Sequence, residues 1–324
     1  MERVKRKKVN IQKDDTLDSI IFGKISFEKY VDYLGNSENR IGGPIVYAES
    51  TCASCKDNVA IITKLSEQDK DILKVFEGIN TNVISHYDNF TQETKVHISN
   101  VTPYKDEVFY NCLKQNSPFT KNDIPNLRAY NYIFLEGAQG DYDVELIKEC
   151  STRGKVALDA SSFICKINPK TLLIENKDYN TIKQLLPYCD YVLFNQDQLR
   201  PLTDMARTKD ACEVIKSLGA KEVLVSRNNV LCLLDNNYNY REERIAESLN
   251  LNRAYLNTTT FVSYVNHRIT SDPINALYCA CAIGTIKLKR PGPLLCNRVE
   301  IDHILKFFYY YKPIEFLETV PDDI

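Results

Sequence analysis

Glycine is scarce in this sequence, with 11 residues among 324, whereas an average chain of this length carries roughly twice as many. Loops that wrap phosphate groups use glycine for positive φ angles and for close approach of the backbone. Neither the GxxxxGK[ST] phosphate loop nor the GxGxxG dinucleotide fingerprint occurs in the chain. The sequence therefore gives no support to either of these glycine-based nucleotide sites.

Long apolar runs and a strong net charge are also missing. No stretch reaches the roughly 18 apolar residues of a membrane-spanning helix, and no apolar signal-peptide core follows the charged N-terminus. The formal net charge is −2, so no overall field draws the protein to nucleic acid or to an acidic membrane. We therefore expect a cytoplasmic protein that binds neither.

The N-terminal 17 residues are polar and include a basic run at residues 3–9. Such a terminus is typical of a flexible, solvated tail. A nuclear or anionic-surface signal is the alternative that the basic run leaves open. The ordered pattern begins at residue 18, and we expect one domain over residues 18–324.

Cysteines are plentiful, and their number, 11, is odd. Without a signal peptide they are expected to be reduced and mostly buried. Cys52 and Cys55 form a CxxC pair, and Cys279 and Cys281 form a CxC pair. Both pairs fall in predicted core helices, and side chains two positions apart on a helix point about 200° apart. We therefore expect no metal site.

Apolar strand patterns alternate with helix patterns along most of the chain, as at residues 19–23, 59–63 and 155–161. This alternation predicts a three-layer α/β/α sandwich with a mostly parallel central sheet. Two alternating runs on either side of residues 87–93 predict a hairpin outside that sheet. We accordingly expect a small β-flap, mainly within residues 80–110, that carries His86 and His97.

In parallel sheets, ligands bind beyond the carboxyl ends of the strands. Asp159 and Asn195 each end a predicted strand, and a polar loop precedes Thr258. The glycine pair Gly42-Gly43 stands directly before a predicted helix, where backbone N–H groups lack intrahelical partners. These positions are where the sequence places a site.

The order of these segments resembles the ribokinase-like, PfkB-type family of ATP-dependent small-molecule kinases. The resemblance covers about residues 18–305 and is carried by the stretches IFGKISFEKYV, IGGPIVYA, LIKECSTRGKVALDAS, CDYVLFNQDQLRPL and TTTFVSYVNHR with the following ALYCACAIGTIKLKRPGP. It implies phosphoryl transfer from ATP, with Mg²⁺, to a hydroxyl of a sugar or nucleoside.

The resemblance also implies roles for individual residues. On the substrate side it points to Glu28, Gly42, Gly43 and Asp159. On the nucleotide and Mg²⁺ side it points to Asn195, Gln198, Asn228, Asn257 and Thr258. The family's catalytic base, the aspartate of a GAGD-like turn, corresponds to Thr259.

Several of these positions depart from the family pattern. Thr259 cannot accept a proton near neutral pH, and loss of a positioned base costs about 10²–10⁴-fold in rate. Both glycines of the turn are absent, and Gln198 stands where the family has a glutamate. Glu28 is one methylene longer than the expected aspartate. A hydroxyl at Thr258 or Thr259 can still cap the following helix.

These departures favour a ribokinase-like protein that has lost most phosphotransfer activity and acts by binding a small-molecule ligand or a protein partner. The alternative is an active, divergent kinase that uses Asp197, Glu28 or Asp272 in unfamiliar roles, although Asp272 before Pro273 is typical of a helix N-cap. A homodimer formed through the β-flap is a further possibility. The aromatic segment 305–317 is either a last core helix or a partner-docking surface.

Overall fold

The computed structural model describes residues 19–55, 59–77, 81–102, 105–125, 131–137, 140–176, 178–245, 253–290, 292–294 and 296–310, without the side chains of residues 100–102 and 105–107. The predicted basic tail, residues 1–17, lies outside the described residues. Across the described helices, none is long and apolar enough to cross a membrane.

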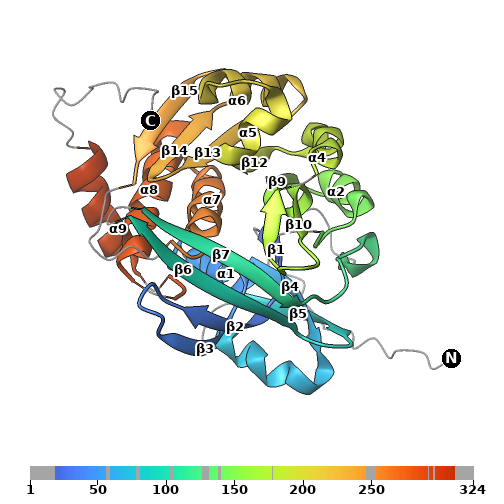
Figure 1. Ribbon diagram of the computed structural model, residues 1–324. Coiled ribbons are helices and arrows are strands. Elements are labelled where there is room, and N and C mark those ends of the chain that lie inside the picture. Colours follow the sequence, from blue (N-terminus) through green and yellow to red (C-terminus); the bar gives the residue numbers. More distant parts are fainter. Residues whose placement is uncertain are drawn as a thin grey trace.

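Within the described residues, nine strands form the central sheet in the order β15-β14-β13-β12-β9-β8-β1-β4-β5 (Figure 1). The strands from β13 to β5 pair in parallel, while β14 and β15 add an antiparallel edge. Their bounds are β1 Ser19–Phe22, β4 Val59–Ser66, β5 Thr81–Asp88, β8 Tyr132–Leu135, β9 Lys155–Asp159, β12 Tyr191–Asn195, β13 Glu222–Arg227, β14 Val230–Leu234 and β15 Tyr240–Arg244. The central strands are buried on both faces, which explains their continuous apolar runs.

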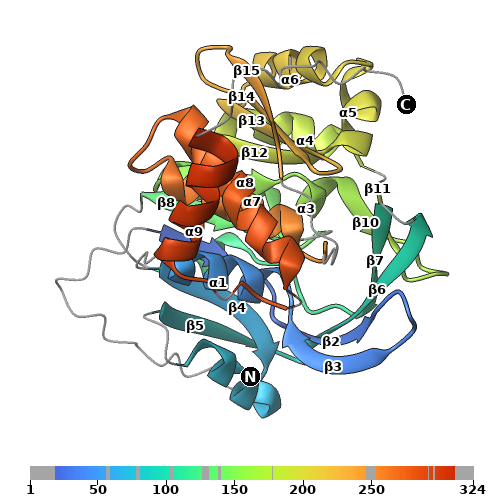
Figure 2. The same cartoon turned by 90° about the vertical axis from the view of Figure 1, so that its left-hand side faces the viewer.

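Helices cover both faces of this sheet, so the predicted three-layer α/β/α fold is confirmed. One face packs against α1 Pro44–Cys55, α7 Leu256–His267, α8 Pro273–Lys289 and α9 Arg298–Ile304 (Figure 2). The other face packs against α2 Val144–Ser151, α3 Ser161–Ile164, α4 Asn180–Leu185, α5 Gln196–Thr203 and α6 Thr208–Ser217. Short 3₁₀ segments at Glu67–Phe76, Lys121–Asp123 and Leu186–Tyr188 complete the connections.

A second sheet, here called the lid, lies beside the carboxyl ends of the central strands. It pairs its strands in the order β3-β2-β6-β7, with bounds β2 Ser26–Val31, β3 Ser37–Gly42, β6 Gln92–Thr102 and β7 Lys105–Lys114. A two-stranded ribbon, β10 Cys165–Ile167 and β11 Ile174–Asn176, adjoins β7. Figure 2 shows the lid curving away from the main body.

The predicted hairpin around residues 87–93 is wrong. β5 continues the central sheet in parallel with β4, whereas β6 belongs to the lid and pairs with β2 and β7. His86 is therefore on the central sheet, and only His97 is on the lid. Alternating residues show that a segment is a strand with two different faces, but they do not specify its pairing partner. The lid also takes in residues 26–42, outside the predicted 80–110.

Helix α8 follows the sequence expectation closely. Asp272 is its N-cap, accepting hydrogen bonds from the amides of Ile274 and Asn275, and Pro273 occupies the first helical position. The helix is buried along most of its length between α7 and the edge of the sheet. Its small side chains permit this close packing: a Cβ at Gly284 would lie 2.9 Å from Thr260 Cγ2 on α7.

Candidate functional site

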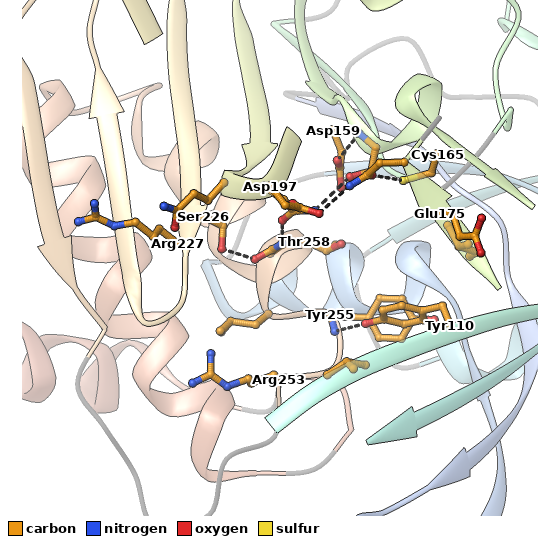
Figure 3. Close-up of a pocket in the computed structure, with 18 of the residues that line it drawn as sticks. Tyr110, Asp159, Cys165, Glu175, Asp197, Ser226, Arg227, Arg253, Tyr255 and Thr258 are labelled. Carbon is orange, nitrogen blue, oxygen red and sulfur yellow. Dashed lines mark hydrogen bonds between the residues drawn. The ribbon is translucent and has the colours of Figure 1, made fainter. Parts of the chain in front are cut away.

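A cavity of about 1040 Å³ opens at the carboxyl ends of β9, β12 and β13 (Figure 3). Strand ends supply Asp159, Asn195 and Ser226 to its wall, as the parallel sheet predicts. The lid closes another side with residues of β6 and β7, and the starts of α1 and α7 complete the wall. The fold thus brings the lid, three strand ends and two helix starts to one chamber.

A hydrogen-bonded network joins the start of α7 to the strand ends. The Asn257 amide group donates to Asn195 Oδ1 at 2.5 Å, and Ser226 Oγ donates to Asn257 Oδ1 at 2.7 Å. Asn195 also donates to Ser161 Oγ at 3.5 Å. The predicted residues Asn195 and Asn257 are therefore in contact. Ser161 and Ser226 were missed, because a lone serine after a strand has no distinctive pattern.

The start of α7 presents open backbone amides to the cavity. Tyr255 precedes the helix with φ +58°, and its carbonyl accepts the Thr259 amide at 3.1 Å, while the Leu256 amide bonds to Arg253. The amides of Asn257 and Thr258 have no acceptor within the described residues, and both residues line the cavity. Such amides at the positive end of a helix dipole favour an anion.

The expected threonine cap is wrong. Thr258 and Thr259 lie inside the first turn of α7, and the cap position is Tyr255, which makes no side-chain cap bond. The helix starts earlier because the Tyr255 amide is held by Tyr110 Oη at 3.0 Å and the Asn257 side chain by the strand ends. Thr258 lines the cavity, whereas Thr259 is fully buried and its hydroxyl has no partner within the described residues.

Two carboxyl groups are relevant here, and neither is at position 259: Glu136 interacts with Thr258 at this helix start, and Asp159 lines the same cavity. Glu136 follows β8 directly and is fully buried, with no hydrogen-bond partner of normal geometry for either oxygen within the described residues. Burial raises its pKa well above the ordinary value, Asp159 raises it further, and the Thr258 hydroxyl partly offsets the rise. Burial also raises the pKa of Asp159 to about 6, against opposing hydrogen bonds from Ser161.

Glu136 and Asp159 are neighbours because they continue adjacent parallel strands in which Leu135 is opposite Leu158, and Asp159 lines the cavity. With a pKa near 6, Asp159 is ionised at neutral pH yet basic enough to accept a proton. Burial and the neighbouring Asp159 both raise the pKa of Glu136 and so disfavour its ionised form. Glu136 was overlooked in the sequence, although it has the same signal that identified Asp159, an acidic residue directly after an apolar strand.

Glu28, predicted to bind substrate, does not line this cavity. Its carboxylate is 2 % exposed and accepts from Gly43 N at 2.8 Å, Arg40 Nε at 3.0 Å and the Tyr255 hydroxyl. We call these contacts the lid latch, because they join β2 and β3 of the lid to the starts of α1 and α7. The longer glutamate reaches partners of the protein itself, so no substrate contact remains for it in this arrangement.

The glycine pair serves the same latch. A Cβ at Gly42 would lie 2.3 Å from the Glu28 carboxyl carbon, and Gly43 adopts φ +96°. The Gly43 amide, expected to be open at the helix start, is used by Glu28. Pro44, the next residue, lines the cavity.

Some of the residues predicted for the nucleotide side line the cavity, and others are buried in the protein interior. Asn228 lines the cavity with φ +50°, a conformation that asparagine tolerates better than most residues. Gln198 is fully buried and closes a capping box, its Oε1 accepting from Asn195 N at 3.0 Å. Asp197, beside it, lines the cavity and accepts from Asn176 at 2.6 Å. The carboxylate at this helix start is therefore Asp197.

Basic and acidic side chains lie on different sides of the cavity wall. In the view of Figure 3, Arg227 and Arg253 lie to the left of the α7 start, and Asp159 and Glu175 lie to the right. Arg200 and Arg207 also line the cavity. Guanidinium groups match phosphate oxygens in geometry as well as in charge.

The remaining sequence candidates lie elsewhere. The 11 cysteines are free thiols, and Cys52, Cys279 and Cys281 are buried. Across the described residues, no three His, Cys, Asp or Glu side chains group as metal ligands. His267 and His303 are on α7 and α9, outside the cavity. Residues 305–310 of the aromatic segment form a π-helical turn that buries Leu305 and Tyr309 and exposes Phe307. The partner-docking role stays a prediction, and residues 311–317 lie outside the described part.

Comparisons with protein-family models and with curated proteins find no match. Solved structures do match. A pyrophosphate-dependent kinase in the ribokinase family, complexed with a pyrophosphate analog and myo-inositol, aligns with a TM-score of 0.75 and 19 % identity over 88 % of this chain and 99 % of that chain.

Two further structures show the same arrangement. Ribokinase from Arabidopsis thaliana, complexed with ribose and ATP, aligns with a TM-score of 0.69 and 15 % identity over 90 % of this chain and all of that chain. A putative ribokinase II from E. coli, in complex with ATP and Mg²⁺, aligns with a TM-score of 0.69 and 13 % identity over 89 % and 99 % of the two chains. The chain therefore has the ribokinase-like fold.

Proposed function

We propose that the protein is a phosphotransferase that moves a phosphoryl group from an anionic donor to a hydroxyl of a small polyhydroxy acceptor. One observation carries the proposal: Asp159 and the open amides at the start of α7 line the same cavity, and Glu136 lies beside Asp159 at the end of the adjacent strand. Phosphoryl transfer needs a base beside the acceptor hydroxyl and donors around the transferred group. Both are present without an acid at position 259.

In this proposal Asp159 is the catalytic base. Its carboxylate accepts the proton of the acceptor hydroxyl while the acceptor oxygen forms a bond to phosphorus and the donor's bridging P–O bond breaks. The amides of Asn257 and Thr258 hold the oxygens of the transferred group. Burial first, and then the neighbouring Asp159, raise the pKa of Glu136, which favours its uncharged form beside the base.

ATP with Mg²⁺ and pyrophosphate with Mg²⁺ are the two donors to test, because structures of this fold bind each class. The donor side fits an anion, since Arg227 and Arg253 line it beside the open amides. Asp197 and the Asn195 oxygen are the groups here that would face hydrated Mg²⁺. When bound, Mg²⁺ would neutralise charge on the transferred phosphate.

The test is turnover of each donor with a panel of neutral polyols and nucleosides. We expect Asp159→Asn to reduce turnover by about 10²–10⁴-fold. The matched control is Asp143→Asn, an equally small change at an exposed carboxylate that caps α2. Equal turnover in both variants would contradict the role of Asp159.

A second candidate is a binding protein without transfer activity. It is favoured by the buried Thr259 at the family's base position and by the use of Glu28 in the lid latch. Calorimetric titration of the same donors and polyols separates the two. Binding of both classes with no turnover by the wild type would favour the second candidate.

A further inference from the structure

Asp141 is a second carboxylate at the cavity that the proposed reaction does not use. It lies just before α2, its side chain is 3 % exposed, and it lines the cavity wall. Its Oδ1 is 2.8 Å from Lys24 Nζ, and the Lys24 side chain is fully buried. Lys24 also donates to the Asn116 carbonyl at 2.9 Å. A buried, paired lysine therefore fixes the position of this carboxylate.

Gly137 provides the space into which this carboxylate extends. A Cβ at Gly137 would lie only 2.6 Å from Asp141 Oδ2, and both residues line the cavity. Gly137 directly follows Glu136, so Asp141 lies near the proposed reacting groups. The neighbouring Tyr142 agrees with this proximity: its hydroxyl donates to the Glu136 carbonyl at 2.6 Å, and its pKa is raised by burial first and then by Asp141, Glu136 and Asp159.

The lid supplies an independent sign of a ligand. Gln92, at the start of β6, is 9 % exposed and lines the same cavity. Its Oε1 has no hydrogen-bond partner within the described residues. A buried amide oxygen without a donor is costly unless a bound group supplies one. A hydroxyl of an acceptor in this chamber would do so.

We propose that Asp141 is an acceptor-binding residue, held by Lys24 and given room by Gly137, which accepts hydrogen bonds from acceptor hydroxyls and excludes phosphorylated acceptors. This rests on the proposed function for identifying the chamber as the acceptor side. Among the described cavity residues from the lid, the starts of α1 and α3 and the ends of β8 and β9, there is no arginine or lysine. A phosphate on the acceptor would face Asp141 and Asp159 with no cationic side chain in this part of the wall, because the buried Lys24 does not line the cavity.

The experiment is calorimetric titration without any phosphoryl donor. The probes are myo-inositol, ribose and adenosine, each compared with its monophosphate. We expect at least one neutral probe to bind the wild-type protein and to bind about 10-fold or more tightly than its monophosphate. Asp141→Asn should weaken that neutral probe by about 10-fold or more, because a charged acceptor of hydrogen bonds is lost.

Two further variants guard against a simple folding defect. Gly137→Ala keeps every charge but displaces the Asp141 carboxylate, and it should weaken the same probe. Asp143→Asn, at the exposed cap of α2, should leave binding unchanged. The proposal is overturned if no neutral probe binds, if a monophosphate binds more tightly than its neutral partner, or if Asp141→Asn and Gly137→Ala both bind like the wild type. The titration contains no phosphoryl donor, so its results do not depend on turnover. A protein that binds the acceptor but does not transfer phosphate would therefore still give the expected binding results.

Discussion

At the scale of single residues, the location of an acidic side chain in the folded protein is a better guide to its role than its position in a sequence motif. Alignment of the sequence puts the family's base on Thr259, and the structure buries that side chain away from the cavity. The carboxyl groups near the cavity come instead from Glu136, directly after β8, and Asp159, at the end of the neighbouring β9. The missing aspartate therefore does not leave the chamber without an acid–base group.

Replacement of Thr259 tests this distinction. Thr259→Val keeps the shape and removes a buried hydroxyl that has no partner in the described structure. We expect the free energy of unfolding to stay constant or to rise by up to about 1 kcal/mol. Chemical denaturation measures it. A fall of similar size would mean that the hydroxyl makes a stabilising contact, and Thr259→Ser, which keeps the hydroxyl, would then be the less damaging change.

The carboxyl pair predicts a pH dependence of stability. The pKa of Asp159 rises from 3.8 to about 6 on folding, and that of Glu136 rises well above its ordinary value. The folded protein therefore holds protons that the unfolded chain releases. This stabilisation is complete below about pH 4 and is lost as the pH rises through 6 and beyond.

Thermal unfolding from pH 4 to pH 8 at constant ionic strength tests this sign. Relative to Glu136→Gln, the wild type should lose stability as the pH rises, since the uncharged amide has no proton to lose. The difference in stability between the two proteins cancels the contribution of groups that both contain. One such group is His267, whose lowered pKa makes stability rise with pH. Parallel curves for the two proteins would show that the Glu136 carboxyl is not buried as described.

At the scale of secondary-structure elements, the start of α7 is fixed by the lid. Tyr255 stacks on Tyr47 with ring centroids 4.2 Å apart, lies 5.3 Å from the Tyr110 ring, and donates its hydroxyl to Glu28. Its left-handed φ places the Asn257 and Thr258 amides at the cavity. The lid latch thus links the position of the lid to the start of α7, whose open amides line the cavity.

A pair of tyrosine variants tests the lid latch. Tyr255→Phe keeps the stacked ring but leaves the buried Glu28 carboxylate with one donor fewer. We expect it to lower the free energy of unfolding by about 1–3 kcal/mol. Tyr47→Phe is the matched control, because the Tyr47 hydroxyl is buried without a partner in the described structure. Urea denaturation of both proteins measures the contrast, and equal effects would argue against a special role for the Glu28 contact.

At the scale of the whole molecule, two apolar cores enclose the central sheet, one on each face. The cysteines follow these cores: nine are buried, and Cys55 and Cys296 are partly exposed. Burial raises the pKa of buried thiols, to about 12 for Cys150 and for Cys165. A raised pKa leaves little thiolate, which is the reactive form.

Thiol titration tests this arrangement. In the native protein, a disulfide reagent at pH 8 should label at most two thiols quickly, those of Cys55 and Cys296. After denaturation in guanidinium all 11 thiols should react. Rapid native labelling of four or more would show that a core opens readily or is packed differently.

The sequence by itself determined the class of fold and the edge of the sheet where the site lies. Alternating strands and helices specify parallel pairing, and polar residues at the ends of apolar strands, Asp159 and Asn195, marked the cavity. These signals are local, because they depend on the order of elements and on which residues are apolar.

Tertiary structure decided the rest. It paired β5 with the central sheet and β6 with the lid, used Glu28 in the lid latch, and started α7 at Leu256. It also brought Asp141 and Asp159 to one chamber with the open amides of α7, and placed Glu136 in the protein interior beside Asp159. These outcomes depend on contacts between segments that are far apart in the chain. A local sequence pattern cannot specify such contacts, because an alternating strand can pair with several other strands and an acidic residue can reach several partners. Packing of the whole chain selects one of them.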